Sequence, residues 1–253
     1  NIDDNFDDLM ENGKYITQNR CIEPNILSFR KTAMQRYIVA LVDNFEYRAA
    51  YEILKDNEFL FSAEALNLLK YAVLRQDDNN EYLKMKDINN QFSFTKDSEA
   101  KKACDYYCIL SNKAKTGELS YFVLLLKPLI EYIAKSYTGS IDKNEAIACL
   151  NDYYSKKINS YYIEKPSYNI EEYVAIMRHK KLDEETVNKF DEIRDYLVAR
   201  NELAHDLQRV EYLDTNSALK KLRFLLKRTY GNKIKDNSLN IYDLINQKIK
   251  DTL

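Results

Sequence analysis

Residues 183–205 read DEETVNKFDEIRDYLVARNELAH, and this stretch decides the helical interpretation of the chain. Asp183 is a good N-cap, and the two glutamates after it suit the positive end of a helix dipole. An apolar stripe at three- and four-residue spacing follows, formed by Val187, Phe190, Ile193 and Leu197 and continued by Arg200 and Ala204. The pattern predicts one helix that starts at Asp183 and closes with residues 200–205.

The rest of the chain is also poor in helix breakers. Its 253 residues include only four Gly and three Pro, and 45% are hydrophobic and 31% charged. Turn-rich β structure needs more Gly and Pro than this, whereas abundant Leu, Lys and Glu favour long solvated helices. We therefore predict an all-α protein, in which a helical connector array is followed by a helical bundle.

A change in composition divides the chain near residue 95. Polar stretches at residues 76–80 and 89–95 flank one short predicted helix, Glu81–Ile88. Shorter helices precede this region, predicted over residues 25–44, 47–54 and 63–74. Longer helices follow it, predicted over residues 97–115, 118–136, 142–154, 170–179, 215–230 and 240–249. We place a domain boundary here and predict domains at residues 1–95 and 96–253.

The net charge of −2 and the pI near 5.9 limit the functions open to the chain. A protein that grips nucleic acid with its whole surface is excluded by this balance. A local basic cleft is not, because a short RNA needs only a few cations. The most apolar run, residues 121–133, is interrupted by Lys127 and Pro128 and is too short for a membrane span.

Cysteine usage indicates a reduced, cytoplasmic protein. The four cysteines, Cys21, Cys104, Cys108 and Cys149, show no disulfide-framework spacing. Cys104 and Cys108 lie one helical turn apart, but no second Cys or His pair completes a metal site, so we predict buried thiols and no metal. The chain has no signal peptide and starts at Asn1 without a methionine, so we expect a processed or truncated piece.

Arg200, Asn201 and His205 form a small group suited to phosphodiester chemistry. Arginine can clamp a phosphate oxygen, and histidine can exchange protons with the 2′-oxygen or the leaving 5′-oxygen of RNA. Asn201 would hold Arg200, His205 or the substrate by hydrogen bonds. The nucleophile is the RNA's own 2′-hydroxyl, so this chemistry needs no metal or cofactor. One histidine does not comfortably serve as acid and base, so we expect two copies of the site across a two-fold axis.

Spacing alone makes this a weak motif. An arginine at this distance before one of two histidines arises by chance with a probability on the order of 0.2. A helix-surface ion pair plus a satisfied histidine is the blander explanation, and spacing alone favours it at roughly two to one.

The string Arg-Asn-x-x-Ala-His at Arg200–His205 resembles the R-x4–6-H signature of the HEPN superfamily. The most similar members are the HEPN ribonucleases of type III CRISPR systems. The resemblance implies a helical connector at residues 1–95, which includes the segment YIVALVDNFEYRAA at residues 37–50, and a HEPN domain at 96–253. It also implies a metal-independent homodimer with Arg200 and His205 catalytic and Asn201 as an accessory. In that group a cyclic oligoadenylate activator binds a preceding sensor domain, which is not visible in this chain.

Basic residues beside the motif are further candidates for RNA contacts. His179 and Lys180 belong to a basic cluster at a predicted helix end, and Lys221 and Arg228 belong to the basic helix after the motif. A solvated helix end is the favoured explanation for the first pair. A charged face on an amphipathic helix explains the second pair equally well.

Two weaker candidates complete the set. Glu131 would orient Arg200 if it faced the motif helix, but a surface carboxylate is the preferred interpretation. Tyr161 and Tyr162, with Lys156 and Lys157 nearby, would stack unpaired bases. Tyrosine is so common in this chain that ordinary packing is preferred.

The leading hypothesis is a dimeric endoribonuclease that cuts single-stranded RNA in CRISPR antiviral defence and leaves 2′,3′-cyclic phosphates. One alternative is a HEPN toxin or abortive-infection nuclease. The other is a non-catalytic helical module, in which Arg200 and His205 only stabilise a dimer.

Overall fold

A computed structural model of the chain describes residues 10–11, 14–15, 26–197 and 213–253. The prediction of catalytic residues at Arg200, Asn201 and His205 lies outside the described residues, and so does Cys21.

The all-α prediction is confirmed. The α-helices are α1 (Ile26–Asp43), α2 (Tyr47–Lys55), α3 (Ala63–Gln76), α4 (Lys86–Phe92), α5 (Ser98–Lys115), α6 (Leu119–Thr138), α7 (Lys143–Ile158), α8 (Ile170–His179), α9 (Glu184–Arg194), α11 (Thr215–Tyr230) and α12 (Ile241–Thr252). Short 3₁₀ helices are η2 (Glu58–Leu60), η3 (Asn80–Lys84), η4 (Gly231–Lys233) and η5 (Asp236–Asn240). Two-residue strands, β1 (Met10–Glu11) and β2 (Lys14–Tyr15), pair antiparallel.

Helix starts are set by side-chain oxygens that accept backbone N–H bonds. The structure shows such bonds at the predicted N-cap Asp183 of α9, and also at the starts of α3, α5, α7 and α11, from Ser62, Asp97, Asp142 and Asp214. Each cap satisfies an amide that has no partner within its helix. Helix α11 ends at Gly231, as predicted, where φ is 53° and a residue without Cβ is favoured.

Two helix predictions are wrong in detail. The single helix predicted over residues 81–88 is instead η3 and α4, with Met85 between them at φ −80° and ψ 62°. Burial overrides helical propensity here, because Tyr82 packs edge-on against Tyr71 at a centroid distance of 5.7 Å. The helix predicted from Asp183 to His205 is not continuous either. Helix α9 ends at Arg194, and the N–H of Asp195 points to the carbonyl of Ile193.

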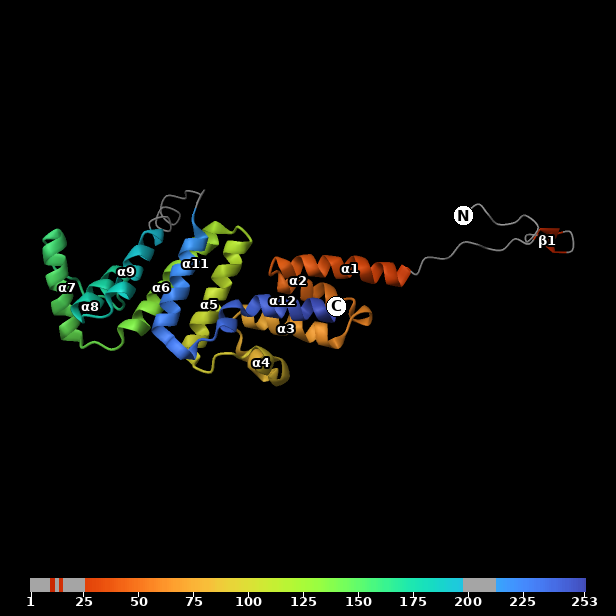
Figure 1. Cartoon of the computed structure of the whole chain (residues 1–253), viewed down its shortest axis with the longest axis horizontal. Coiled ribbons are helices and arrows are strands. Elements are labelled where there is room, and N and C mark those ends of the chain that lie inside the picture. The colour runs from red at the N-terminus through yellow and green to blue at the C-terminus, as the bar shows by residue number, and fades with distance from the viewer. Residues whose placement is uncertain (1–9, 12–13, 16–25, 198–212) are drawn as a thin grey trace.

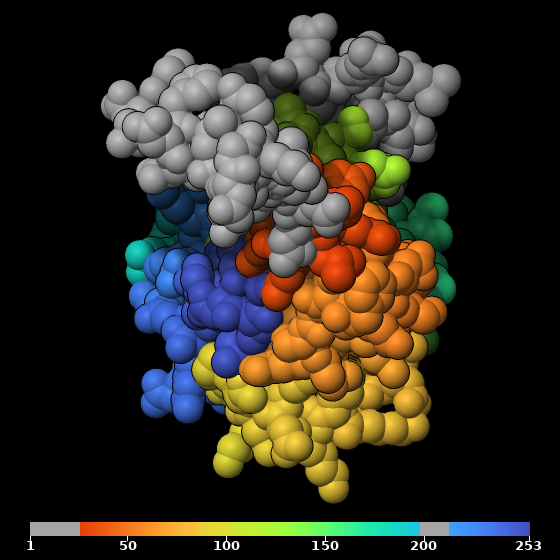
Figure 2. Space-filling view, turned by 90° about the vertical axis from the view of Figure 1, so that its right-hand side faces the viewer, coloured from red at the N-terminus to blue at the C-terminus, as the bar shows by residue number. Residues whose placement is uncertain are grey.

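The helices form two adjoining groups along the long axis of the molecule (Figure 1). Helices α1, α2 and α3 make an array at one end. Helices α5, α6, α8, α9 and α11 make a bundle, with α7 on its outer side. The last helix, α12, leaves the bundle and packs against α3 and α1 of the array. Figure 2 shows its surface in contact with theirs. The predicted domain boundary at residue 95 stays a prediction.

The contact of α12 with the array is specific. Asn246 accepts a hydrogen bond from Tyr47 Oη at 2.5 Å and donates to the carbonyl of Val42 at 2.8 Å. The Tyr47 and Tyr242 rings stack at 5.9 Å. At the far end of α12, Ser62 donates to the Thr252 carbonyl at 3.1 Å. A helix near the end of the sequence therefore completes a group built from the first helices.

One large hydrophobic core runs through both groups, from α1 to α12. A second, smaller core lies between α7 and α8, formed by Ala146, Cys149, Leu150, Ala175 and Ile176. Because α7 is held mainly through this small core, it forms an outer layer on α8, whose other face belongs to the large core.

The described cysteines are buried free thiols, as predicted for Cys104, Cys108 and Cys149. Burial raises the pKa of Cys104 to about 12, so this thiol stays protonated at neutral pH. Within the described ranges no group of three or more His, Cys, Asp and Glu side chains is placed to hold a metal ion. No described helix combines the length and the apolar character needed to cross a membrane.

Candidate functional site

Helices α9 and α11 carry the two flanks of the predicted Arg200–His205 motif. They pack antiparallel, because Lys221 on α11 lies 3.3 Å from Glu192 near the end of α9, whereas Arg228 lies 2.8 Å from Glu185 near its start. Leu197 is the last described residue before the motif, and Leu213 is the first one after it. Both flanks therefore lie at one end of the α9–α11 pair.

The apolar stripe that leads to the motif is buried as predicted. Exposed fractions are 2% for Val187, 0% for Phe190 and Ile193, and 7% for Leu197. The stripe therefore faces the bundle core up to the last described residue. Arg200 continues the same stripe in the sequence, and its position lies outside the described residues.

Lys221 is the predicted RNA contact that lies at the motif end of α9. Its ammonium is 3.3 Å from Glu192 and 5.2 Å from the centroid of the Tyr196 ring. Glu192 also accepts two hydrogen bonds from Lys189, at 2.9 and 3.0 Å, and these hold its pKa below the usual range. Lys221 is only 22% exposed. It joins the second turn of α11 to the residues that precede the motif.

The other three predicted contacts lie at the opposite end of α9, roughly 16 Å away for an 11-residue helix. Arg228 pairs with Glu185 and lies 5.4 Å from the Phe224 ring. Lys180 donates to the carbonyls of Thr138 at 2.6 Å and Ser140 at 3.1 Å, so it closes the end of α6.

His179 is the fourth of these candidates, and its Nε2 lies 3.5 Å from Glu145 Oε1. The structure thus gives each of the four predicted RNA contacts a protein partner, and only Lys221 lies beside the motif flank.

The prediction that Tyr161 and Tyr162 are ordinary packing residues is confirmed for Tyr162 only. Tyr162 stacks on Tyr154 at 6.1 Å, and its N–H donates to Asn151 at 2.9 Å. Tyr161 is 81% exposed, so the packing prediction is wrong there. The hydrogen bond to Asn151 turns Tyr162 inward, and its neighbour in the connector points away.

Glu131, the other weak candidate, pairs with Lys127 at 3.6 Å, as a partly exposed carboxylate.

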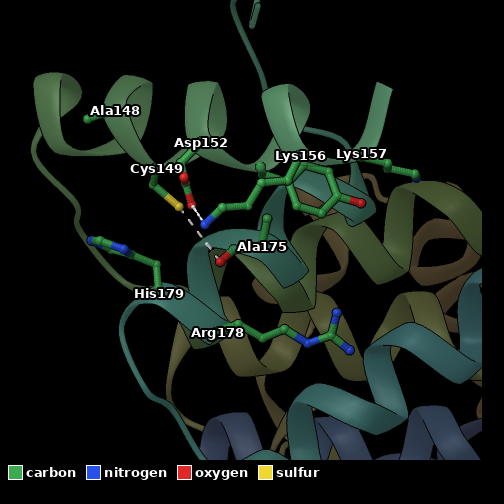
Figure 3. A pocket seen from close by; sticks show the side chains of 9 residues that line it. Ala148, Cys149, Asp152, Lys156, Lys157, Ala175, Arg178 and His179 are labelled. Atoms are coloured by element: carbon green, nitrogen blue, oxygen red, sulfur yellow. Dashed lines mark hydrogen bonds and ion pairs between the residues drawn. The ribbon is translucent and has the colours of Figure 1, made fainter. Parts of the chain in front are cut away.

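A groove between α7 and α8 was missed by sequence reasoning (Figure 3). Its volume is about 530 Å³, and its walls include Lys156, Lys157, Arg178 and His179. Residues 156–157 and 178–179 lie in separate predicted elements, and the packing of α7 on α8 places them along one groove, toward its opposite ends. A pattern of lysines at the end of one helix and a basic cluster at the end of another was the sole sequence signal.

The described part of the chain is all-helical, and helices α9 and α11 flank the sequence segment that holds the Arg-x4-His motif. The sequence model described as the Cas_Csm6 HEPN domain matches residues 92–250, and that of the CRISPR-associated protein Csm6 6H domain matches residues 24–76. The chain therefore belongs to the Csm6 HEPN family.

Two curated relatives are named CRISPR system endoribonuclease Csm6. The protein from Enterococcus italicus is 26% identical over 217 residues, which are 77% of this chain and 46% of that protein. The protein from Streptococcus thermophilus is 24% identical over 263 residues, which are 91% of this chain and 60% of that protein. The chain thus spans about half the length of these relatives.

A solved structure has the same fold. Enterococcus italicus Csm6 bound to cyclic hexa-2′-fluoro-hexa-dAMP aligns with a TM-score of 0.72 at 19% identity. The alignment covers 90% of this chain and 59% of that one.

Proposed function

We propose that this chain is the ribonuclease portion of a CRISPR defence protein and cleaves single-stranded RNA without a metal ion. One observation carries the proposal: the Csm6 HEPN match at residues 92–250 contains Arg200, Asn201 and His205. These are the residue types that phosphodiester cleavage by a 2′-hydroxyl requires. The relatives named endoribonucleases support the same activity.

In the proposed reaction the 2′-oxygen attacks the adjacent phosphorus and the bond from phosphorus to the 5′-oxygen breaks. A 2′,3′-cyclic phosphate forms on one product, and a 5′-hydroxyl forms on the other. One histidine removes the proton of the 2′-hydroxyl, and a second protonates the leaving oxygen. Arg200 stabilises the charge on the phosphoryl oxygens, and Asn201 orients these groups. Two histidines require two copies of His205, which is why the active species is proposed to be a homodimer.

The kind of substrate follows from the same chemistry, and the kind of activator from a solved relative. Attack in line with the leaving oxygen needs backbone freedom that a duplex restricts, so the substrate is proposed to be single-stranded. A cyclic oligoadenylate is the proposed activator of the longer family members. The cyclic hexa-2′-fluoro-hexa-dAMP bound to Enterococcus italicus Csm6 supports this. The alignment with this chain covers 59% of that protein, which leaves 41% of it outside the aligned region. A sensor domain that binds a cyclic oligoadenylate is proposed to regulate the ribonuclease portion described here.

Incubation of the purified chain with unstructured RNA and an excess of chelator tests the proposal. Cleavage is expected to continue with the chelator, because the nucleophile and both proton carriers come from RNA and protein. The products should carry 2′,3′-cyclic phosphate ends by mass spectrometry. Cleavage that stops with the chelator and returns with a divalent metal contradicts the mechanism.

Lys221→Ala separates two roles for this lysine. If the side chain mainly braces Tyr196 and Glu192, kcat should fall by about 3- to 10-fold with little change in KM, since a misplaced group lowers the rate of the chemical step. Lys221→Arg, which retains the charge and the contact with the ring, should recover most of the rate. A rise in KM with unchanged kcat would instead identify Lys221 as an RNA contact. Steady-state cleavage of a fluorescent RNA makes the measurement.

A further inference from the structure

The groove between α7 and α8 has a cationic wall. Lys156 and Lys157 come from α7, and Arg178 and His179 come from α8. Asp152 is the one carboxylate among the described lining residues. Figure 3 shows Asp152 and Lys156 directed from α7 toward α8, with His179 and Arg178 on α8 and the Arg178 side chain extended along that helix. The groove surface itself is therefore positive, although the whole chain carries a net charge of −2.

The carboxylates that pair with these cations lie mostly outside the groove. Lys157 pairs with Glu171, Arg178 with Asp191 at 2.8 Å, and His179 with Glu145 at 3.5 Å. None of these three acids lines the groove. They hold the cationic side chains in place without covering the wall.

The cation of each ion pair is open to solvent, and the Lys156–Asp152 pair is exposed on both sides. The Lys156 and Asp152 side chains are 74% and 65% exposed, whereas Arg178 is 52% exposed and its partner Asp191 only 28%. Exposed ion pairs contribute little free energy, because water screens them and long side chains lose entropy in forming them. A phosphate group can therefore take the place of an exposed carboxylate at small cost, and an arginine fork can bind it through two N–H groups.

The floor and one end of the groove suit a polynucleotide strand. Small residues, Ala148, Cys149 and Ala175, form part of the lining, so a backbone can lie close to the helices. Tyr153 supplies an aromatic ring, which lies 5.6 Å from the Lys157 ammonium. A cationic groove with a ring for base stacking is the usual arrangement for single-stranded nucleic acid.

The groove also leads toward the motif end of the bundle. Helix α8 runs antiparallel to α7, because Lys157 pairs with Glu171 and His179 with Glu145. A short turn at residues 180–183 joins the end of α8 to the start of α9, and the two helices pack along each other, so the end of α9 lies toward the start of α8, where Glu171 pairs with Lys157. The Lys157 end of the groove therefore lies near the α9 terminus from which the motif continues, and the His179 end points away from it.

We infer that the α7–α8 groove, with Lys156, Lys157 and Arg178 as its phosphate-binding residues, holds the part of a single-stranded RNA that flanks the cleavage site. This inference rests on the proposed function for its substrate. It assigns the grip on the RNA strand to an outer layer of the bundle, separate from the residues that carry the chemistry.

Binding measured without cleavage tests the groove independently of the reaction. The probe is a labelled, unstructured RNA of about 20 nucleotides, longer than a single binding site needs. It is titrated by fluorescence anisotropy into the full chain carrying His205→Ala. Adding Lys156→Ala, Lys157→Ala and Arg178→Ala together is expected to weaken binding at least 10-fold at low salt. The magnitude of the slope of log K against log salt should fall by about 2, because each of the three lost phosphate contacts contributes about 0.7.

A control with the same loss of charge is available outside the bundle, on α2, η3 and α12. Lys55, Lys84 and Lys248 are exposed lysines, each paired with a glutamate, and replacing all three by alanine should change affinity less than 2-fold. The double variant Lys156→Ala, Lys157→Ala keeps the Arg178–Asp191 pair, and it should show an intermediate loss if the triple variant does not fold.

The possible results separate the two proposals. Equal losses in the groove and control variants, unchanged binding in the groove variants, or no RNA binding by the His205→Ala chain would each overturn the groove inference. If the unmutated chain binds RNA through the groove but never cleaves it, the groove inference stands and the proposed function fails.

Discussion

Replacing His205 by alanine should lower the rate of RNA cleavage by about 10²–10⁴-fold, the range typical for loss of a general acid or base. In the proposed dimer the substitution removes the proton acceptor and the proton donor together, so the loss should lie near the top of this range. Single-turnover cleavage of an unstructured RNA gives the rate constant for the chemical step.

Arg200→Lys should be nearly as damaging as Arg200→Ala, about 10²-fold or more in kcat. Lysine keeps the charge, but it lacks the planar fork that holds two phosphate oxygens. Arg48→Ala is the matched control, because Arg48 is 70% exposed on α2 and pairs with the exposed Asp77. Its cleavage rate should stay within about 2-fold of the parent chain.

Two outcomes would contradict this assignment. Full activity in His205→Ala would remove histidine from the mechanism. A lost dimer in both motif variants, together with no cleavage by the unmutated chain, would instead favour the non-catalytic dimerisation module. Analytical ultracentrifugation of each variant separates loss of chemistry from loss of assembly.

Asp105→Ala should lower the free energy of unfolding by about 3–5 kcal/mol, because it leaves a buried guanidinium without its carboxylate. Arg75 on α3 is 5% exposed and donates through Nε and Nη2 to Asp105 on α5, with the Nε bond at 3.1 Å. Its Nη1 donates to Tyr71 Oη at 2.9 Å and to the carbonyl of Phe92 at 3.3 Å. Burial raises the pKa of Asp105, and the guanidinium beside it opposes that rise.

Chemical denaturation measures this loss, and two further variants interpret it. Asp77→Ala removes the acid of the exposed Arg48–Asp77 pair and should cost at most about 1 kcal/mol. Arg75→Met combined with Asp105→Leu removes both buried charges and should recover much of the stability. If Asp105→Ala costs no more than Asp77→Ala, the buried pair contributes no more than an exposed one.

The Arg75–Asp105 pair joins the two family-matched regions. Arg75 lies within residues 24–76 and Asp105 within residues 92–250. The same variant should therefore weaken the attachment of the array to the bundle.

Local features of the fold were predictable, because local interactions decide them. The helices predicted to start at residues 97 and 142, for example, do start there, since the Asp97 and Asp142 side chains each accept a bond from an amide two or three residues ahead. The prediction of one helix over residues 81–88 was wrong because a tertiary contact decides the structure there. Tyr82 is buried against Tyr71 and interrupts the predicted turns. Local propensity carries no information about that contact.

In the candidate site, too, the local motif was predictable from the sequence and the contacts between separate helices were not. The motif at residues 200–205 is readable from the sequence, because its residue types and spacing belong to one short segment. The pairing of Lys221 with Glu192, and the meeting of Lys156 with His179 in one groove, depend on how separate helices pack. A sequence pattern identifies such cations as basic, but it does not distinguish those on a groove wall from those that close a helix.

The return of α12 to the array has a consequence for the order of folding during translation. Val42 and Tyr47 receive their partner Asn246 only after about 200 further residues have been made. The array, which is synthesised before the bundle, stays without its closing helix until the ribosome has passed the whole bundle. The bundle helices α5 to α11 can pack while the chain is still growing, since their contacts are nearer in sequence. Slow synthesis near the last helix should therefore prolong the time for which the first helices expose their apolar faces.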